Sequence, residues 1–145
     1  MSKTSPYNLE FAREYQKKIA FAEHLGFYIE HLEDGMARLS CALRPEMTNS
    51  WGIAHGGVIL TLLDVTLCMA ARTQHPDSGG VMTIDMSTSF TNAGKVKLLA
   101  EGRVLRPGRS VIFTEGEVRN TDGTLVAKGM ATVRARDAEK KTAEK

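Results

Sequence analysis

One carboxylate stands inside an otherwise apolar stretch of this 145-residue chain. From Gly56 to Ala71 every residue except Asp64 is apolar, glycine or threonine. A helix that is apolar on all sides belongs inside a fold, where a carboxylate is costly unless it has a partner or a chemical role. Asp64 could be a nucleophile or the general base that activates a water molecule. The alternative is an aspartate bonded to a neighbouring backbone group, which is uncommon within an apolar helix.

Two glycines stand where this stretch begins. Gly56 and Gly57 occupy the expected helix start, where N–H groups lack partners and the helix dipole is positive. Because glycine lets a ligand approach the backbone closely, these N–H groups could polarise a carbonyl and stabilise an oxyanion. The alternative is that the glycines only permit a tight turn into a packed helix.

Three polar residues nearby are further candidates. Asn49 could donate to the carbonyl or hold the attacking water, or it could form an Asx turn. His55 could orient the loop or contact substrate, but a lone histidine at a helix start more often has a structural role, and the helix field disfavours its protonation. A second acid, Asp85, is interpreted as a solvated or interface residue of a strand.

The spacing of the two main candidates constrains the quaternary structure. Gly56 and Asp64 are eight residues apart, which places them about 12 Å apart along one helix. Both cannot meet the same carbonyl carbon from one subunit. If both act in catalysis, the oxyanion donor and the carboxylate come from different chains. This predicts an obligate homodimer with two equivalent sites at a twofold interface.

The flanking sequence predicts the elements that position this helix. Residues 8–23 suggest an amphipathic helix, and Asp34-Gly35 marks a hairpin turn between strands at 26–32 and 36–43. Residues 44–54 form a loop, and the long helix runs from about residue 55 to residue 73. Alternating patterns predict four more strands, at 81–91, 96–106, 110–119 and 125–136.

The faces of these strands follow from the alternation. Residues 81–91 are expected to direct Met82, Ile84, Met86 and Phe90 to the apolar face and Thr83, Asp85, Ser87 and Ser89 to the opposite face. Residues 96–106 direct Val96, Leu98, Ala100 and Val104 to one face. In the last strand the small residues Ala127, Gly129 and Ala131 share a face, as expected where a helix packs close. A single antiparallel sheet that curls around one apolar helix, an α+β fold, satisfies this order.

Composition indicates one globular domain, with 42% hydrophobic and 25% charged residues. The net charge of +2 is too small to favour nucleic acid as a partner. The apolar run is shorter than the ~20 residues of a membrane span, and residues 1–7 lack a signal-peptide core. We therefore expect a soluble, cytoplasmic protein without a membrane partner.

Cysteines and histidines give no sign of a disulfide framework or a metal centre. Cys41 and Cys68 are expected to be reduced core residues. The four histidines show no metal-ligand spacing, so no metal site is expected.

The order of elements and the string Asn49…Gly52…His55-Gly56-Gly57…Asp64 resemble the hotdog-fold thioesterases of the phenylacetic-acid-degradation (PaaI) type. The resemblance covers roughly residues 25–136, with an N-terminal helical segment at 1–24 and a charged, frayed tail at 137–145. It implies a curved sheet wrapped around a central helix, and a homotetramer built as a dimer of dimers. It implies hydrolysis of an aromatic or medium-chain acyl-CoA to the free acid and coenzyme A, which is part of the substrate, with no separate cofactor.

The resemblance also implies roles for single residues. The Gly56 N–H would face the thioester carbonyl, and Thr83 would help to orient the water. The alternation places Thr83 away from the apolar face, which fits only if that face meets the partner subunit. The alternative function is a non-catalytic acyl-CoA-binding protein of the same fold.

The phosphates of coenzyme A need cations and N–H donors. The turn Arg106-Pro107-Gly108-Arg109-Ser110 offers two arginines and is a candidate substrate-binding segment together with Gly57, or else a solvated hairpin. Less specific cations are Arg72, Lys95, Lys97 and Arg103.

Overall fold

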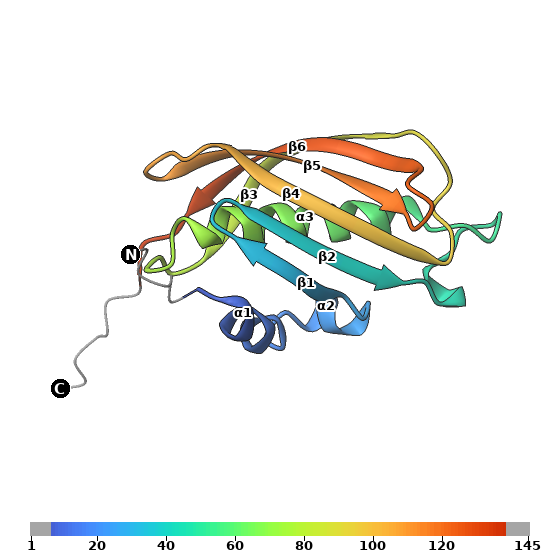
Figure 1. The fold of residues 1–145 in the computed structure, drawn as a ribbon, viewed down its shortest axis with the longest axis horizontal. Helices are drawn as coiled ribbons and strands as arrows, with labels where there is room; N and C mark the ends of the chain where they lie inside the picture. The colour runs from blue at the N-terminus through green and yellow to red at the C-terminus, as the bar shows by residue number, and fades with distance from the viewer. Residues whose placement is uncertain (1–6, 139–145) are drawn as a thin grey trace.

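The computed structural model describes residues 7–138. The helices are α1 (Leu9–Gln16), α2 (Ala20–His24) and α3 (Gly56–Thr73), with a short 3-10 turn at Pro45–Met47. The strands are β1 (Tyr28–Glu33), β2 (Met36–Ala42), β3 (Val81–Phe90), β4 (Lys97–Arg106), β5 (Val111–Asn120) and β6 (Leu125–Ala135). They form one antiparallel sheet in the order β1-β2-β4-β5-β6-β3. Figure 1 shows this sheet curving around α3, with α1 and α2 beside β1.

The predicted α+β fold is confirmed, and small residues explain how the helix fits into the sheet. Gly102, Gly116 and Gly129 lie opposite one another on three neighbouring strands. A Cβ at Gly102 or Gly116 would come within 2.8 or 2.9 Å of Leu67 Cδ2, and one at Gly129 within 3.0 Å of Leu63 Cδ2. The glycines therefore let α3 approach the strands closely.

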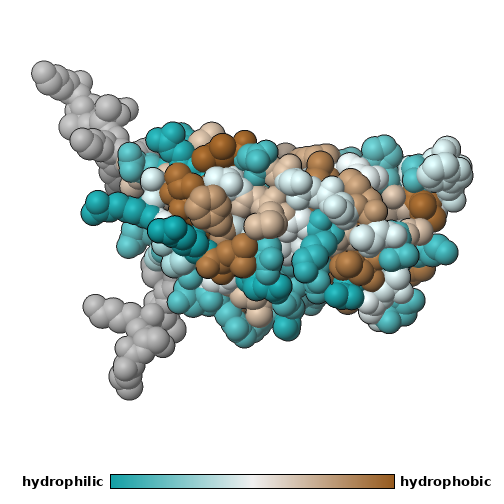
Figure 2. Space-filling model, turned by 90° about the horizontal axis from the view of Figure 1, so that it is seen from above, coloured by the Kyte–Doolittle hydropathy of each residue, from teal (hydrophilic) through white to brown (hydrophobic). Residues whose placement is uncertain are grey.

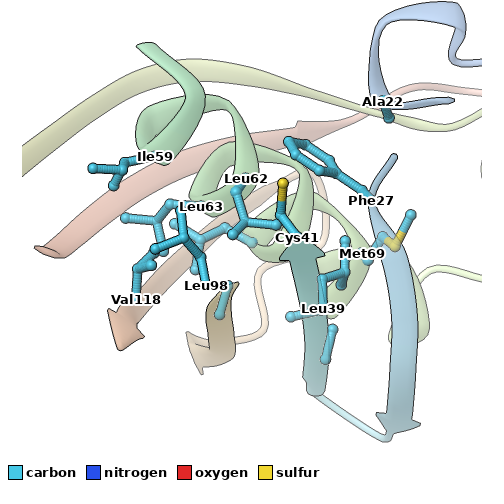
Figure 3. Close-up of a cluster of buried hydrophobic side chains, with 14 of the residues drawn as sticks. Ala22, Phe27, Leu39, Cys41, Ile59, Leu62, Leu63, Met69, Leu98 and Val118 are labelled. Atoms are coloured by element: carbon cyan, nitrogen blue, oxygen red, sulfur yellow. The ribbon is translucent and has the colours of Figure 1, made fainter. Parts of the chain in front are cut away.

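The core consists of apolar residues from α3 and from the inner face of the sheet. Leu62 and Leu63 of α3 are fully buried, and Figure 3 shows them beside Leu98 and Val118 of β4 and β5. By length and composition alone α3 could cross a membrane, but 61% of its 18 residues are buried here. A helix buried to this extent is typical of the core of a globular domain.

The single helix predicted at residues 8–23 is wrong, because the chain turns between α1 and α2. Arg13 donates two hydrogen bonds to the Ile29 carbonyl and so fixes α1 against β1. The buried Gln16 donates to the Phe27 carbonyl at 2.7 Å. These contacts with distant residues end α1 after Gln16, although no glycine or proline marks the break.

The predicted apolar face of strand 81–91 is confirmed only at Met86, which packs against the core. Met82, Ile84 and Phe90 are 50%, 57% and 53% exposed, whereas Thr83 faces α3 of its own chain. The register against β6 shifts between Thr83 and Asp85. Such a bulge adds one residue to the strand and exchanges its two faces.

Val96 is a third difference, because it precedes β4 in a turn with φ of 63° and is 81% exposed. Leu98 and Ala100 are buried as predicted. The division of the chain at residues 24 and 136 stays a prediction, and residues 1–6 and 139–145, including most of the predicted tail, lie outside the described residues.

Candidate active site

Asp64 lies in the middle of α3, half-buried, with one carboxylate oxygen held in place. The Thr83 hydroxyl donates to Asp64 Oδ1 at 2.5 Å. Cys68 Sγ lies 3.2 Å from the same hydroxyl and 4.0 Å from Oδ1. Oδ2 has no hydrogen-bond donor among residues 7–138 and is therefore available to a water molecule or to an electrophile.

Beside Asp64 is a cavity of about 260 Å³ between α3 and the N-terminal segment. Its wall combines Asp64, Cys68 and Arg72 of α3 with the aromatic residues Tyr7 and Tyr15. The apolar part of the wall comes from Ile19, Val65, Met69 and Val81. A carboxylate on the wall of a largely apolar cavity is an arrangement typical of ligand-binding and active sites.

Among the described residues, one backbone donor at the N-terminus of α3 is left without an acceptor. His55 is the N-cap, and its Nδ1 accepts the Gly57 N–H at 2.8 Å. The Gly57 N–H is therefore occupied, and His55 has the structural role considered for it. The Gly56 N–H has no acceptor among the described residues, so this donor can bind an oxyanion.

Asn49 forms the Asx turn that was its alternative interpretation. Its Oδ1 accepts the Trp51 N–H at 2.9 Å, which leaves the Nδ2 hydrogens as donors. Asn49 and Gly56 line a second cavity, of about 300 Å³, together with Ile59 and Phe90. The two candidate donors therefore share one cavity, and Asp64 lines another.

The arginine-containing turn lies at the opposite end of α3 from Gly56. Arg109 and Ser110 line a third cavity, of about 480 Å³, with Gln74 and His75, which follow the C-terminus of α3. Arg106 and Arg109 are exposed and form no ion pair within residues 7–138. A Cβ at Gly108 would come within 1.6 Å of the Val111 carbonyl oxygen, so the turn itself requires this glycine. Within one chain this turn does not line either of the cavities that Asp64 and Gly56 line, and Figure 1 shows the loop between β4 and β5 at the opposite end of the molecule from the start of α3.

Sequence reasoning did not connect Cys68 or Arg72 with Asp64. Both follow Asp64 at intervals of four residues, so the three form one row along α3. This spacing is visible in the sequence and would have identified Cys68 and Arg72 as residues on the same side of the helix as Asp64. Arg72, considered above as a less specific cation for the phosphates, is buried. Asp85 is exposed, in agreement with its interpretation as a solvated residue.

The thiol of Cys68 should make stability fall at high pH. Burial, and then the nearby Asp64 carboxylate, raise the pKa of Cys68 from 9.0 to about 12. The unfolded thiol loses its proton above pH 9 while the folded thiol keeps it, so the free energy of unfolding falls as pH rises from 9 to 12. Burial raises the pKa of Tyr7 to about 12 as well, in the same direction. Urea unfolding of wild type and Cys68→Ala across this range is the measurement, and an equally steep fall in both proteins would contradict the assignment to Cys68.

Within residues 7–138, no three histidine, cysteine or acidic side chains come together as a metal site would require. Both cysteines are free, with Cys41 buried and Cys68 half-buried.

Comparison with known proteins gives consistent matches. The family model described as thioesterase superfamily matches residues 52–127. A protein of Saccharolobus solfataricus whose name assigns it provisionally to the esterases is 31% identical over 119 residues, 81% of this chain and 84% of its own length. Acyl-coenzyme A thioesterase 13 of Mus musculus is 29% identical over 100 residues, 66% of this chain and 71% of its own length.

A solved structure shows the same fold at lower sequence identity. The PaaI protein from the phenylacetic acid degradation operon of E. coli superimposes with a TM-score of 0.85 at 20% identity. The match covers 94% of this chain and 98% of that protein. The similarity therefore includes the N-terminal helical segment as well as the sheet.

Proposed function

This chain belongs to the thioesterase superfamily and is a thioester hydrolase, and from this premise we propose that it hydrolyses acyl-CoA to a free acid and coenzyme A. The observation that carries the proposal is Asp64, a carboxylate on the wall of a largely apolar cavity, with one oxygen fixed by Thr83 and the other without a donor among the residues that the structure describes. The name of the mouse relative supports coenzyme A as the thiol part of the substrate.

The proposed reaction uses the N-terminus of α3, at Gly56, and Asp64 in the middle of the same helix. The Gly56 N–H, with Asn49 Nδ2, would bind the thioester carbonyl oxygen and stabilise the negative charge that develops there. Asp64 would accept a proton from water, whose oxygen then bonds to the carbonyl carbon. The carbon–sulfur bond breaks, and the proton passes to the departing thiolate. In the alternative sequence Asp64 attacks the carbonyl carbon directly, and the carbon–sulfur bond breaks to release the thiolate of coenzyme A. Water then hydrolyses the resulting anhydride to the free acid and the Asp64 carboxylate, and the proton released passes to the thiolate.

We propose that each site is shared between two subunits. Gly56 and Asp64 lie on one uninterrupted helix about 12 Å apart and line different cavities, so one chain does not bring them to the same carbonyl. The edge strand β3 exposes Met82, Ile84 and Phe90, an apolar edge suited to a second copy. Figure 2 shows separate hydrophobic patches on one face of the molecule, and we propose that contacts of this kind join two such dimers into a tetramer.

The remaining parts of the proposal concern the substrate and its location. Arg106 and Arg109 would bind the phosphates of coenzyme A, because both guanidinium groups are exposed and without an ion partner in the described part of the chain. The Asp64 cavity would take an aromatic or medium-chain acyl group, since its walls are largely apolar. We place the reaction in the cytoplasm, where coenzyme A thioesters would be the substrates.

Thr83 is proposed as a positioning residue, and its removal should lower activity. Thr83→Val deletes the donor to Asp64 Oδ1 and keeps the shape of the side chain. A hydrogen bond to a charged group contributes about 1.5–3 kcal/mol, so we expect kcat to fall about 10-fold or more with little change in KM. Thr83→Ser should restore most of kcat, and equal loss in both variants would contradict the role of the hydroxyl.

A thiol-release assay tests the function itself. Benzoyl-, phenylacetyl- and straight-chain acyl-CoA from C4 to C16 would be offered to the purified protein, with free thiol as the readout. The proposal expects turnover of at least one member. Binding of these thioesters without turnover of any would contradict hydrolysis and favour the non-catalytic acyl-CoA-binding alternative.

A further inference from the structure

Arg72 is a buried cation that nothing in the described part of the chain neutralises. The residue is 8% exposed, and its Nε has no hydrogen-bond partner among residues 7–138. None of the ion pairs in that range includes Arg72, so no carboxylate, Asp64 included, lies within 4.0 Å of its guanidinium nitrogens. A buried charge without a partner is costly, and its persistence points to a group that binds there.

Two aromatic rings hold the guanidinium in place. Its central carbon lies 5.3 Å from the ring centre of Tyr7 and 5.4 Å from that of Tyr15. Such contacts orient a guanidinium group but do not offer oxygen acceptors in its plane. The N–H groups therefore remain available to a planar anion such as a carboxylate.

The position of Arg72 relates this cation to the reaction. Arg72 lines the same cavity as Asp64 and follows it by eight residues, about 12 Å further along α3. The intervening wall is largely apolar, with Val65 and Met69 on the helix and Ile19 and Val81 opposite. A ligand that fills this cavity from Asp64 to Arg72 would have a reactive carbonyl at one end, an apolar body and an anion at the other end.

We propose that Arg72 binds a carboxylate at the far end of the acyl chain, so that the preferred substrates are coenzyme A monothioesters of dicarboxylic acids. This inference rests on the proposed function, because it assigns the acyl specificity of the same site. A site that pairs with a charged group discriminates strongly against an analogue that lacks it, since the buried cation is then left unpaired.

Two substrates of equal length provide the test. Adipyl-CoA and hexanoyl-CoA both carry six-carbon acyl groups and differ in the terminal carboxylate. We expect wild-type kcat/KM to be at least ~10-fold higher for adipyl-CoA. Arg72→Met, which keeps an unbranched stem and removes the guanidinium group, should lower the ratio of kcat/KM for adipyl-CoA to kcat/KM for hexanoyl-CoA by ~10-fold or more. Arg72→Lys keeps a charge without the planar fork and should retain part of the preference.

Each result separates this inference from the proposed function. Turnover of hexanoyl-CoA without any preference for adipyl-CoA in the wild type would overturn the role of Arg72 and leave the hydrolase intact. An equal loss on both substrates in Arg72→Met would assign Arg72 a structural role and also overturn the proposal. If no thioester is hydrolysed, calorimetric titration with the same two thioesters decides, because tighter binding of adipyl-CoA that Arg72→Met abolishes would still support the carboxylate site. If Arg72→Met fails to fold, the wild-type preference and the Arg72→Lys variant decide the question.

Discussion

Asp64→Asn is expected to lower kcat/KM for acyl-CoA hydrolysis by about 10²–10⁴-fold, the range typical for loss of a general acid or base. The asparagine keeps an oxygen that accepts the Thr83 hydroxyl, so the side chain stays in place. It replaces the free carboxylate oxygen with an amide nitrogen, which neither accepts a proton nor attacks a carbonyl. The measurement is steady-state thiol release, with thermal melting of the same samples to show that the fold is retained.

The matched control is Asp85→Asn. Asp85 lies on the neighbouring strand β3, is exposed and has the same side chain as Asp64. We expect its replacement to leave kcat/KM unchanged. Asp64→Asn with wild-type turnover would remove the carboxylate from the mechanism, and equal losses in both variants would show that the substitution acts on the fold or the charge of the protein.

Gly56→Pro is expected to lower kcat by about 10²–10³-fold, the effect of losing one oxyanion donor. Proline at this position deletes the N–H while the helix persists, because the first position of a helix tolerates proline. The preceding residue also suits a proline, since His55 has φ of −64° and ψ of 138°, an extended conformation. Thiol release under substrate saturation isolates kcat, and circular dichroism reports the helix content.

Gly56→Ala separates the loss of the donor from the gain of bulk. A Cβ at this position would lie 3.6 Å from the Phe90 ring, an ordinary contact, and the N–H stays in place. We expect the alanine variant to keep most of the activity that the proline variant loses. Equal losses in the two variants would attribute the effect to crowding of the cavity at the helix start and would contradict the role of the Gly56 N–H.

Much of the fold followed from local patterns. The bounds of α3 were predictable because an apolar run with a glycine pair at its start and proline and glycine after it has few alternatives. The first hairpin followed from Asp34-Gly35, and Gly35 has the positive φ of 76° that such a turn requires. The errors arose where distant contacts override local preference, as in the division of α1 from α2 by the bonds of Arg13 and Gln16.

In the candidate site, too, the residues marked by local sequence patterns were predictable, and the contacts between distant residues were not. Asp64 stood out because it is the one charge within the apolar run from Gly56 to Ala71. Gly56 stood out because it belongs to a glycine pair at the start of that run. The contact between Thr83 and Asp64 within one chain was not predictable from alternation, because a bulge next to Thr83 reverses the faces of β3. The burial of Arg72 was not predicted, since it depends on Tyr7 and Tyr15, residues far away in the sequence.

Subunit complementation tests the shared site most directly. Asp64→Asn keeps Gly56, and Gly56→Pro keeps Asp64, so a mixed dimer holds one complete site if each site takes one group from each chain. The two inactive proteins, unfolded together and refolded at equal concentration, should regain about a quarter of wild-type thiol release, because half of the dimers are mixed and each has one intact site of two. Separately refolded samples combined without exchange should stay inactive. A co-refolded mixture no more active than its components would contradict the account, because it would show that both groups must come from the same chain.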